Sequence, residues 1–300
     1  MSINSFYNNK TILVTGGTGS FGKQFIKFIL KNFKPKKIII FSRDELKQYN
    51  FKQEIGEKKA LRYFLGDIRD FDRLELATKD VDIIVHAAAL KQVDTAEYNP
   101  FEYIKTNIIG AENIIRAVLK NKVRRVIALS TDKAVDPINL YGSTKLASDK
   151  LFIAANNLIG KDNINFSVVR YGNVISSRGS VIPKFQELIK KKNPFIPITH
   201  EEMTRFFITL EESAIFVSRC IYTMLGGETF IPKLYSIKIL DLANSMKLKS
   251  QKIKIVGIRP GEKIHEVLIS SESQSKIVEF KDYFVVEPSI IFFKKKKLFN

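Results

Sequence analysis

The stretch Thr15-Gly16-Gly17-Thr18-Gly19-Ser20-Phe21-Gly22 decides the fold of this chain. It follows Thr11 to Thr15, a short β-branched run that predicts a buried strand. It precedes an amphipathic run with Phe21, Phe25 and Phe28, whose three- and four-residue spacing predicts a helix. The glycines therefore lie in a tight strand-to-helix turn.

Three glycines at three-residue spacing have separate tasks in such a turn. The first permits the turn, the second lets the backbone approach a pyrophosphate, and the third lets the helix pack closely on the sheet. Free N–H groups at the helix N-terminus then attract phosphate. We therefore expect a dinucleotide to bind at Gly16, Thr18, Gly19, Ser20, Phe21 and Gly22.

The alternation of strand and helix continues through the first 170 residues. Strands are expected at 37–41, 61–64, 83–86, 126–129 and 166–169, with helix-length segments between them. The pattern predicts an α/β fold with a doubly wound parallel sheet over residues 1–172. After Arg170 the alternation loosens, so 173–300 is expected to be a smaller substrate-binding region. Part of 205–235 is expected to pack back on the first domain.

Composition limits the partners and the compartment. The net charge of +18 comes from scattered Lys, with only 12 Arg, which favours an anionic small substrate over nucleic acid. Cys220 is the single cysteine and the three His lack ligand spacing, so neither a disulfide nor a metal site is expected. No apolar run approaches the ~18 residues of a membrane span. We expect a soluble, cytoplasmic protein without membrane insertion.

The end of the second strand bears on the choice of dinucleotide. An acidic side chain there accepts the ribose hydroxyls of NAD, whereas a basic one accommodates the extra phosphate of NADP. Ser42 and Arg43 come first and favour NADP, while Asp44 argues for NAD. After the third strand, Asp67 and Ile68 are placed to meet the adenine. Asp67 is equally well explained as a cap of a helix expected from Arg69 to Thr78.

Tyr141 and Lys145 lie four residues apart on an expected helix and so share one face. An ammonium beside a phenol favours the phenolate and lowers its pKa, so Tyr141 can take a proton from a hydroxyl while hydride leaves for a nicotinamide. Thr131 ends the preceding strand, where its hydroxyl can hold the reacting oxygen. Together these residues resemble the active site of the extended short-chain dehydrogenase/reductase family.

Asp132 and Lys133 add a second acid and base to this group. Eliminating water across two carbons needs a base for the carbon-bound proton and an acid for the leaving hydroxyl, which requires some neutral Lys133 and some protonated Asp132. The alternative for such a dipeptide is an exposed ion pair or a helix-capping Asp.

The segments Leu129 to Ala134 and Pro137 to Lys145 resemble the inverting UDP-N-acetylglucosamine 4,6-dehydratases of the pseudaminic acid pathway. The resemblance implies oxidation at carbon 4, loss of water across carbons 5 and 6, and hydride return to carbon 6 on a retained NADP. It implies that Tyr141 is the oxidation base, with Lys145 its partner and ribose ligand. Lys133 would be the base at carbon 5 and Asp132 the acid. Retaining relatives commonly carry Met at the position of Tyr141.

The same resemblance extends to outlying segments. Cofactor contacts are expected from Ala87, Ala88, Lys91 and Asn107, although Asn107 is equally explained as a solvent-facing polar residue. Arg205 and Arg259 fit diphosphate charge, and Glu262 can accept from ribose hydroxyls, unless each is a surface charge. The expected substrate-contact residues are Lys91, Thr131, Tyr141, Asn173, Arg178, Val181, Arg205, Arg259 and Glu262.

Three other functions remain open from the sequence. A retaining dehydratase differs in the outcome at carbon 5, and a UDP-sugar epimerase or reductase has no need of Asp132 and Lys133. A non-catalytic nucleotide sensor on the same fold has no need of Tyr141 and Lys145. The resemblance also implies a homo-oligomer, although the family continues past Val285 to Pro288 with a longer tail than this chain has.

Overall fold

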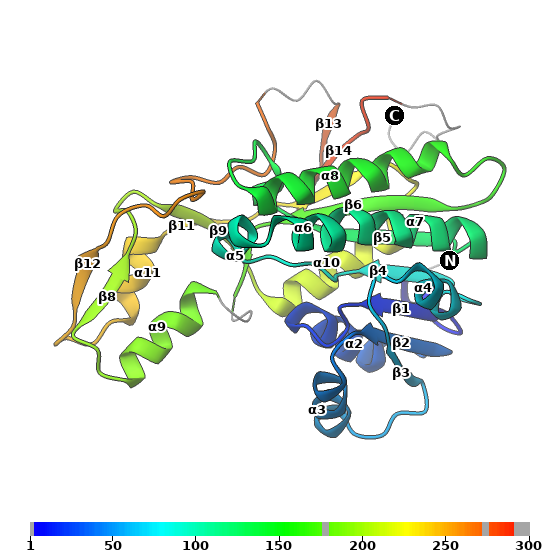
Figure 1. Cartoon of the computed structure of the whole chain (residues 1–300), viewed down its shortest axis with the longest axis horizontal. Helices are drawn as coiled ribbons and strands as arrows, with labels where there is room; N and C mark the ends of the chain where they lie inside the picture. The colour runs from blue at the N-terminus through cyan, green and yellow to red at the C-terminus, as the bar shows by residue number, and fades with distance from the viewer. Residues whose placement is uncertain (1–2, 176–179, 272–275, 291–300) are drawn as a thin grey trace.

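The computed structural model describes residues 3–175, 180–271 and 276–290. Within these ranges the main layer is a nine-stranded sheet in the order β13-β14-β10-β6-β5-β4-β1-β2-β3 (Figure 1). Neighbouring strands from β10 to β3 are parallel, whereas β14 and β13 run antiparallel at the edge. The strands are β1 (Thr11–Thr15), β2 (Lys37–Ser42), β3 (Leu61–Leu65), β4 (Ile83–His86), β5 (Arg125–Thr131), β6 (Asn165–Tyr171), β10 (Thr229–Pro232), β13 (Ile277–Glu279) and β14 (Tyr283–Val286).

Helices cover both faces of this sheet, which confirms the doubly wound α/β fold. Successive residues of a strand point to opposite faces, so Ile12 and Val14 join one apolar cluster and Leu13 joins the other. Helices α2 (Ser20–Asn32), α3 (Glu45–Ile55) and α10 (Leu210–Thr223) pack in the first cluster. Helices α4 (Phe71–Ala77), α7 (Gly110–Asn121) and α8 (Leu140–Ala154) pack in the second.

The smaller region lies beyond one end of the sheet, at the left of Figure 1. It has its own apolar cluster around Phe185, Ile196 and Ile239. Two small sheets, β11-β9-β7 and β12-β8, support it. Its elements are β7 (Asn173–Val174), α9 (Val181–Lys190), β8 (Phe195–Ile198), β9 (Thr204–Ile208), β11 (Ser236–Lys238), α11 (Ile239–Met246) and β12 (Lys252–Ile255).

The chain between β9 and β11 returns to the main sheet. A capping box between Thr209 and Glu212 begins α10, and α10 packs with α2 in the first cluster. Strand β10 then pairs with β6, extending the parallel sheet.

Short elements surround the N-terminus of α8. They are α5 (Val93–Tyr98), α6 (Pro100–Tyr103), the π-helical turn η1 (Ile104–Ile109) and the 3₁₀ turn η2 (Asp132–Ala134). Ala96, Tyr103 and Tyr141 form a small apolar cluster there. The remaining short elements are α1 (Ile3–Phe6) and η3 (Ala155–Asn157). No helix in the described part of the chain has the length and apolar character that crossing a membrane requires.

Candidate active site

A cleft of about 880 Å³ opens at the carboxyl ends of the parallel strands and extends to the smaller region. This edge is where open α/β sheets bind ligands. Most of the residues that the sequence predicts line it. They are Gly16, Thr18, Gly19, Ser20, Phe21, Gly22, Ser42, Arg43, Asp67, Ile68, Ala87, Ala88, Lys91, Thr131, Lys133, Tyr141, Lys145, Asn173, Val181, Arg205, Arg259 and Glu262. Asp132 and Asn107 lie behind the lining, and Arg178 lies outside the described residues.

The glycine turn has the geometry that a dinucleotide needs. Gly16 has a φ of 65°, and a Cβ on it would come within 2.9 Å of the backbone of Ala87 and Ala88. Helix α2 begins at Ser20 with Gly19 as its N-cap, so no side chain caps it. The first N–H groups of a helix lack intrahelical partners. Since this turn lines the cleft, it fits a pyrophosphate there.

The end of β2 presents positive charge to the cleft. Arg43 is 55% exposed, with Nη1 3.6 Å from Asp67 Oδ2. Asp44, the residue that argued for NAD, is the N-cap of α3 and accepts from the Lys47 backbone N–H at 2.9 Å. Its other oxygen pairs with Lys47 Nζ at 2.6 Å. The Asp44 carboxylate is therefore already engaged with its own helix.

Asp67 does not cap the following helix, so that alternative is wrong. Helix α4 begins at Phe71, and its N-cap is Asp70, which accepts from the Arg73 backbone N–H at 3.0 Å. Asp67 instead accepts from the backbone and the guanidinium of Arg69. Burial raises the pKa of Asp67, but the hydrogen bonds and charge of Arg69 outweigh it and leave that pKa lowered. Asp67 is thus an ionised group on the cleft wall.

Tyr141 and Lys145 lie on one face of α8, and both are buried in the cleft wall. Burial raises the pKa of Tyr141; the Thr131 hydroxyl opposes this, whereas the Asp132 charge adds to it. The expectation of a lowered Tyr141 pKa is therefore wrong, because desolvation dominates. Burial also lowers the pKa of Lys145, and Asp149 partly offsets that effect.

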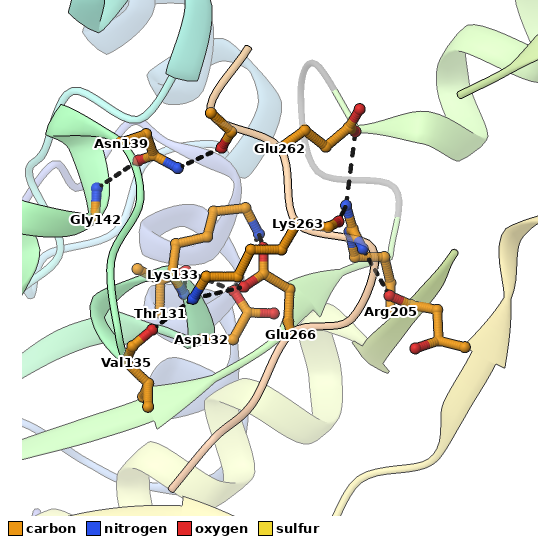
Figure 2. A network of polar contacts seen from close by, with 12 residues as sticks. Thr131, Asp132, Lys133, Val135, Asn139, Gly142, Arg205, Glu262, Lys263 and Glu266 are labelled. Atoms are coloured by element: carbon orange, nitrogen blue, oxygen red, sulfur yellow. Dashed lines mark hydrogen bonds and ion pairs between the residues drawn. The ribbon is translucent and has the colours of Figure 1, made fainter. Parts of the chain in front are cut away.

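Contacts from three directions fix the start of α8. Asn139 is its N-cap and accepts from the Gly142 N–H at 2.8 Å, while its amide donates to the Gly261 carbonyl at 2.8 Å (Figure 2). A Cβ on Gly142 would overlap the Lys133 carbonyl oxygen. Only a glycine lets the helix approach turn η2 this closely. Tyr141 and Lys133 are brought together in this way.

Asn107 is buried, so its alternative as a solvent-facing residue is wrong. Its amide bonds both the N–H and the carbonyl of Leu90 at 2.9 Å and donates to Thr144 Oγ1 at 3.0 Å. Thr144 follows Tyr141 on α8 and bonds the Tyr141 carbonyl. Asn107 thus joins the cleft loop at Leu90 to the catalytic helix from a π-helical turn, an element often found at functional sites.

Asp132 and Lys133 form a largely buried pair and not an exposed one. The Asp132 side chain is fully buried, and its Oδ1 accepts from Thr131 Oγ1 and from Lys133 Nζ, both at 3.0 Å. Turn η2 is capped by Thr131, so the helix-cap reading of Asp132 is also wrong. Lys133 is 21% exposed and lines the cleft. Asp132 is not part of the cleft lining and lies behind it.

A second carboxylate, which sequence reasoning missed, completes this group. Glu266 is buried, lines the cleft, and places Oε1 3.3 Å from Lys133 Nζ. Lys263 Nζ lies 3.7 Å from Glu266 Oε2 and donates to the Val135 carbonyl at 2.6 Å (Figure 2). Glu266 is far from Asp132 in the chain, so no local spacing points to it.

Asp149, also missed, is a buried residue of the catalytic helix itself. It accepts from Ser130 Oγ at 2.5 Å and from Arg170 Nη2 at 3.2 Å, and it is almost completely buried. Its place on α8, four residues after Lys145, is a helical spacing that puts the two on one face. That spacing is the signal by which it was detectable.

The predicted substrate residues of the smaller region divide into two kinds. The Arg205 guanidinium donates to the carbonyls of Thr204, Lys263 and Ile264 at 2.7 to 2.9 Å, so it clasps the chain that carries Glu266. Arg259 is 55% exposed and pairs with Glu262 at 2.8 Å. Burial raises the pKa of Glu262, but Arg259 outweighs it and leaves it lowered. This pair is the more available to a ligand.

His86 in β4 is a core residue. It is 1% exposed and shares a 2.8 Å hydrogen bond with Thr15 Oγ1. Burial, with a contribution from Lys145, lowers its pKa to about 3, so it stays neutral. Among the described side chains, no group of three His, Cys, Asp or Glu could hold a metal ion.

The comparisons with known proteins agree with this geometry. The chain is 55% identical over 284 residues to a UDP-N-acetylglucosamine 4,6-dehydratase (inverting) of Campylobacter jejuni, covering 95% of this chain and 84% of the relative. It is 44% identical to a UDP-glucose 4-epimerase of Rickettsia bellii, covering 92% of this chain and 82% of that one.

Two solved structures share the fold. The structure of Pen from Bacillus thuringiensis has a TM-score of 0.90 at 38% identity, covering 95% of this chain and 91% of that one. The dTDP-glucose 4,6-dehydratase DesIV of Streptomyces venezuelae, with NAD bound, has a TM-score of 0.77 at 20% identity, covering 87% and 89%. Residues 12–288 match the family described as polysaccharide biosynthesis protein. With its glycine turn, its Tyr141–Lys145 helix and its Lys133 in one cleft, the chain belongs to that family of nucleotide-sugar enzymes.

Proposed function

We propose that this chain is an inverting UDP-N-acetylglucosamine 4,6-dehydratase that yields a UDP-4-keto-6-deoxy-L-arabino-hexosamine. One observation carries the proposal: Lys133 lines the same cleft as Tyr141, Lys145 and the dinucleotide turn, and its ammonium pairs with the buried Asp132 directly behind that lining. The 55% identical relative is named for this activity. Inversion in particular is supported by Tyr141, where retaining relatives carry Met.

The residues divide the reaction between two groups. Tyr141 takes the proton of the carbon 4 hydroxyl, with Thr131 bonding the same phenol and Lys145 supplying positive charge. Lys133 takes the proton of carbon 5, and Asp132 gives a proton to the hydroxyl that leaves carbon 6. The nicotinamide supplies hydride acceptance and return, so the cycle is redox-neutral. Desolvation in the cleft strengthens each of these interactions.

The cofactor that we propose is NADP. Arg43 and Lys47 both line the cleft at the end of β2, and Asp44 is engaged in capping α3. Positive side chains there suit a 2′-phosphate, which an unengaged carboxylate would repel. The turn before α2 would hold the pyrophosphate, and Lys145 the ribose of the nicotinamide half.

The proposed UDP-sugar contacts come from the smaller region and the loop after β4. Arg259 carries the charge for a diphosphate, and Glu262 accepts from ribose hydroxyls. Asn173, Val181 and Lys91 line the sugar end of the same cleft. We further propose that the enzyme works in the cytoplasm, since UDP-sugars are made in that compartment. We also propose that it is a homo-oligomer.

The test is incubation with UDP-N-acetylglucosamine in deuterated water, followed by NMR of the product. We expect a 4-keto-6-deoxy sugar inverted at carbon 5 and carrying deuterium there. Lys133→Ala should lose this product by about 10²-fold or more. A product retained at carbon 5 would identify the retaining reaction. Recovery of the 4-epimer, as the name of the Rickettsia relative suggests, would overturn the proposal. Unchanged sugar that nevertheless binds would indicate a sensor.

A further inference from the structure

The loop from Arg259 to Glu266 carries a carboxylate from the smaller region into the catalytic group. Arg205 clasps the loop by its carbonyls, and Asn139 holds the Gly261 carbonyl (Figure 2). Glu266 is the end point of this chain of contacts, with its side chain only 3% exposed. Its Oε1 lies 3.3 Å from Lys133 Nζ. Asp132 Oδ1 lies 3.0 Å from the same nitrogen.

Four charged groups therefore meet in a site that is mostly shielded from water. Lys133 contacts both carboxylates, and Lys263 lies 3.7 Å from Glu266 alone. When all four are ionised the charges cancel. A buried charge without a partner is costly, so proton movement within the group is favoured over proton loss to solvent.

The elimination that we proposed above fits this restriction. Lys133 passes one proton to Asp132, which creates the amine and the acid together. The carbon 5–hydrogen bond then breaks, its proton goes to the Lys133 nitrogen, and its electron pair forms the carbon 5–carbon 6 double bond. The carbon 6–oxygen bond breaks as Asp132 donates its proton to the departing hydroxyl, which leaves as water. Throughout these steps Glu266 and Lys263 keep their charges.

We propose that Glu266 is a positioning residue for carbon 5 proton abstraction: its carboxylate fixes Lys133 Nζ and stabilises the ammonium that forms as the proton arrives. The inference rests on the proposed function. On this proposal the base Lys133, in the main domain, depends on Glu266, on a loop of the smaller region. A substrate held by Arg259 and Glu262 would thus engage the same loop that completes the base.

Glu266→Gln is the decisive variant because it keeps the shape of the side chain and removes the charge. Reduction of bound nicotinamide in a single turnover reports carbon 4 oxidation, and deuterium at carbon 5 reports proton abstraction. We expect oxidation to stay within about twofold of wild type and deuterium incorporation to fall at least about tenfold. Glu266→Asp, which keeps the charge, should recover part of the loss.

The pH profile separates this role from a purely structural one. The titratable groups around Lys133 are Asp132, Glu266, Lys263 and Tyr141. The acid limb of the carbon 5 exchange profile marks the pH at which the group takes up an extra proton from solvent. Loss of the Glu266 negative charge makes that uptake harder, so the limb moves to lower pH. Lys263→Gln removes the competing cation and should move the same limb to higher pH. The shift in Lys263→Gln remains measurable if Glu266→Gln folds poorly.

Glu279→Gln is the matched control, since Glu279 also pairs with a lysine, Lys233, but at the sheet edge outside the cleft. It should leave both steps unchanged. The inference is overturned if Glu266→Gln exchanges carbon 5 at the wild-type rate, or if both steps fall together with an unmoved acid limb in both variants. Failure of the proposed function has a different signature, because wild type itself would then form no 4-keto-6-deoxy product.

Discussion

At the scale of single residues, Gly142 decides whether the two halves of the catalytic group meet. It follows Tyr141 on α8 and lies against the Lys133 carbonyl oxygen of turn η2, with no room for a Cβ. The oxidation base and the elimination base come from different elements. This contact is one of those that set the distance between them.

Gly142→Ala is expected to lower the free energy of unfolding by about 1–3 kcal/mol, because overpacking at a closed contact forces the backbone to shift. The same shift separates Tyr141 from Lys133, so dehydration should fall by more than substrate affinity does. Ser143→Ala is the control, since Ser143 is the exposed neighbour on the same turn. Urea unfolding and steady-state kinetics measure both effects. If Gly142→Ala kept the wild-type stability and rate, turn η2 and helix α8 would be able to move apart at little cost, which would contradict this prediction.

Arg43 carries the proposed preference for NADP over NAD. Arg43→Ala should weaken NADPH binding at least about tenfold and leave NADH binding nearly unchanged, since a charge-assisted hydrogen bond contributes about 1.5–3 kcal/mol. Fluorescence titration of the protein freed of nucleotide measures both affinities. Arg62→Ala, outside the cleft at β3, is the control. Equal losses for the two dinucleotides would contradict a 2′-phosphate site at Arg43.

At the scale of elements, the catalytic helix α8 is positioned by parts of the chain that have no strong propensity of their own. Turn η2, the π-helical turn η1 and the loop from Arg259 to Glu266 all contact its first turns or the residues before it. The contacts of turn η2 and of the loop involve backbone carbonyls, and the contact of η1 joins the side chains of Asn107 and Thr144. The sheet thus places the strand ends at the cleft, and irregular segments fix the position of α8.

Arg205→Lys is expected to loosen the loop that carries Arg259, Glu262 and Glu266. A guanidinium reaches the carbonyls of Thr204, Lys263 and Ile264 at once, whereas an ammonium is a point donor. The KM for the UDP-sugar should rise and kcat should fall, each by about tenfold, because about 1.4 kcal/mol is lost at each stage. Arg219→Lys, an exposed position on α10, is the control. If Arg259→Ala raised the KM and Arg205→Lys did not, the contacts of Arg205 with the loop would have no part in substrate binding.

At the scale of the whole molecule, the buried His86 ties stability to pH. Its pKa is about 3 in the folded protein against an ordinary 6.5, so the unfolded chain binds the proton first as pH falls. Stability is therefore complete above about pH 6.5 and is lost progressively from there towards pH 3. The neutral ring bonded to Thr15 is the form that the core accepts.

Between pH 6.5 and pH 5 this single group should cost the wild type roughly 1.4 kcal/mol per pH unit. His86→Leu should lose stability at neutral pH, with the Thr15 hydrogen bond gone, yet show a flatter pH dependence in this window. Urea unfolding at several pH values measures the slope. His200→Gln, which alters a histidine outside the core, should keep the wild-type slope. An equal slope in His86→Leu would mean that other groups control acid sensitivity.

The proposed homo-oligomer has a surface to test on α5 and α6. Tyr98 is 90% exposed and Phe101, three residues later, is 72% exposed. Exposed large apolar side chains that gather on one face often mark an interface. We expect the double variant Tyr98→Asp, Phe101→Asp to lower the mass measured by light scattering towards the 34.3 kDa of one chain. An unchanged mass would place the interface elsewhere. Leu158→Asp, a large exposed residue after α8, serves as the control.

The sequence by itself determined the parallel sheet, the glycine turn and the Tyr141–Lys145 face, because each depends on local periodicity and on spacing within one element. Most of the site residues that it indicated line the cleft. It missed Glu266, and it gave no sign that the Arg205 guanidinium donates to three backbone carbonyls. It also misjudged the direction of the Tyr141 pKa, since burial outweighs a neighbouring charge. These were decided only by the tertiary structure, because desolvation and ion pairing depend on which distant segments exclude water from a site, and residue spacing carries no record of that.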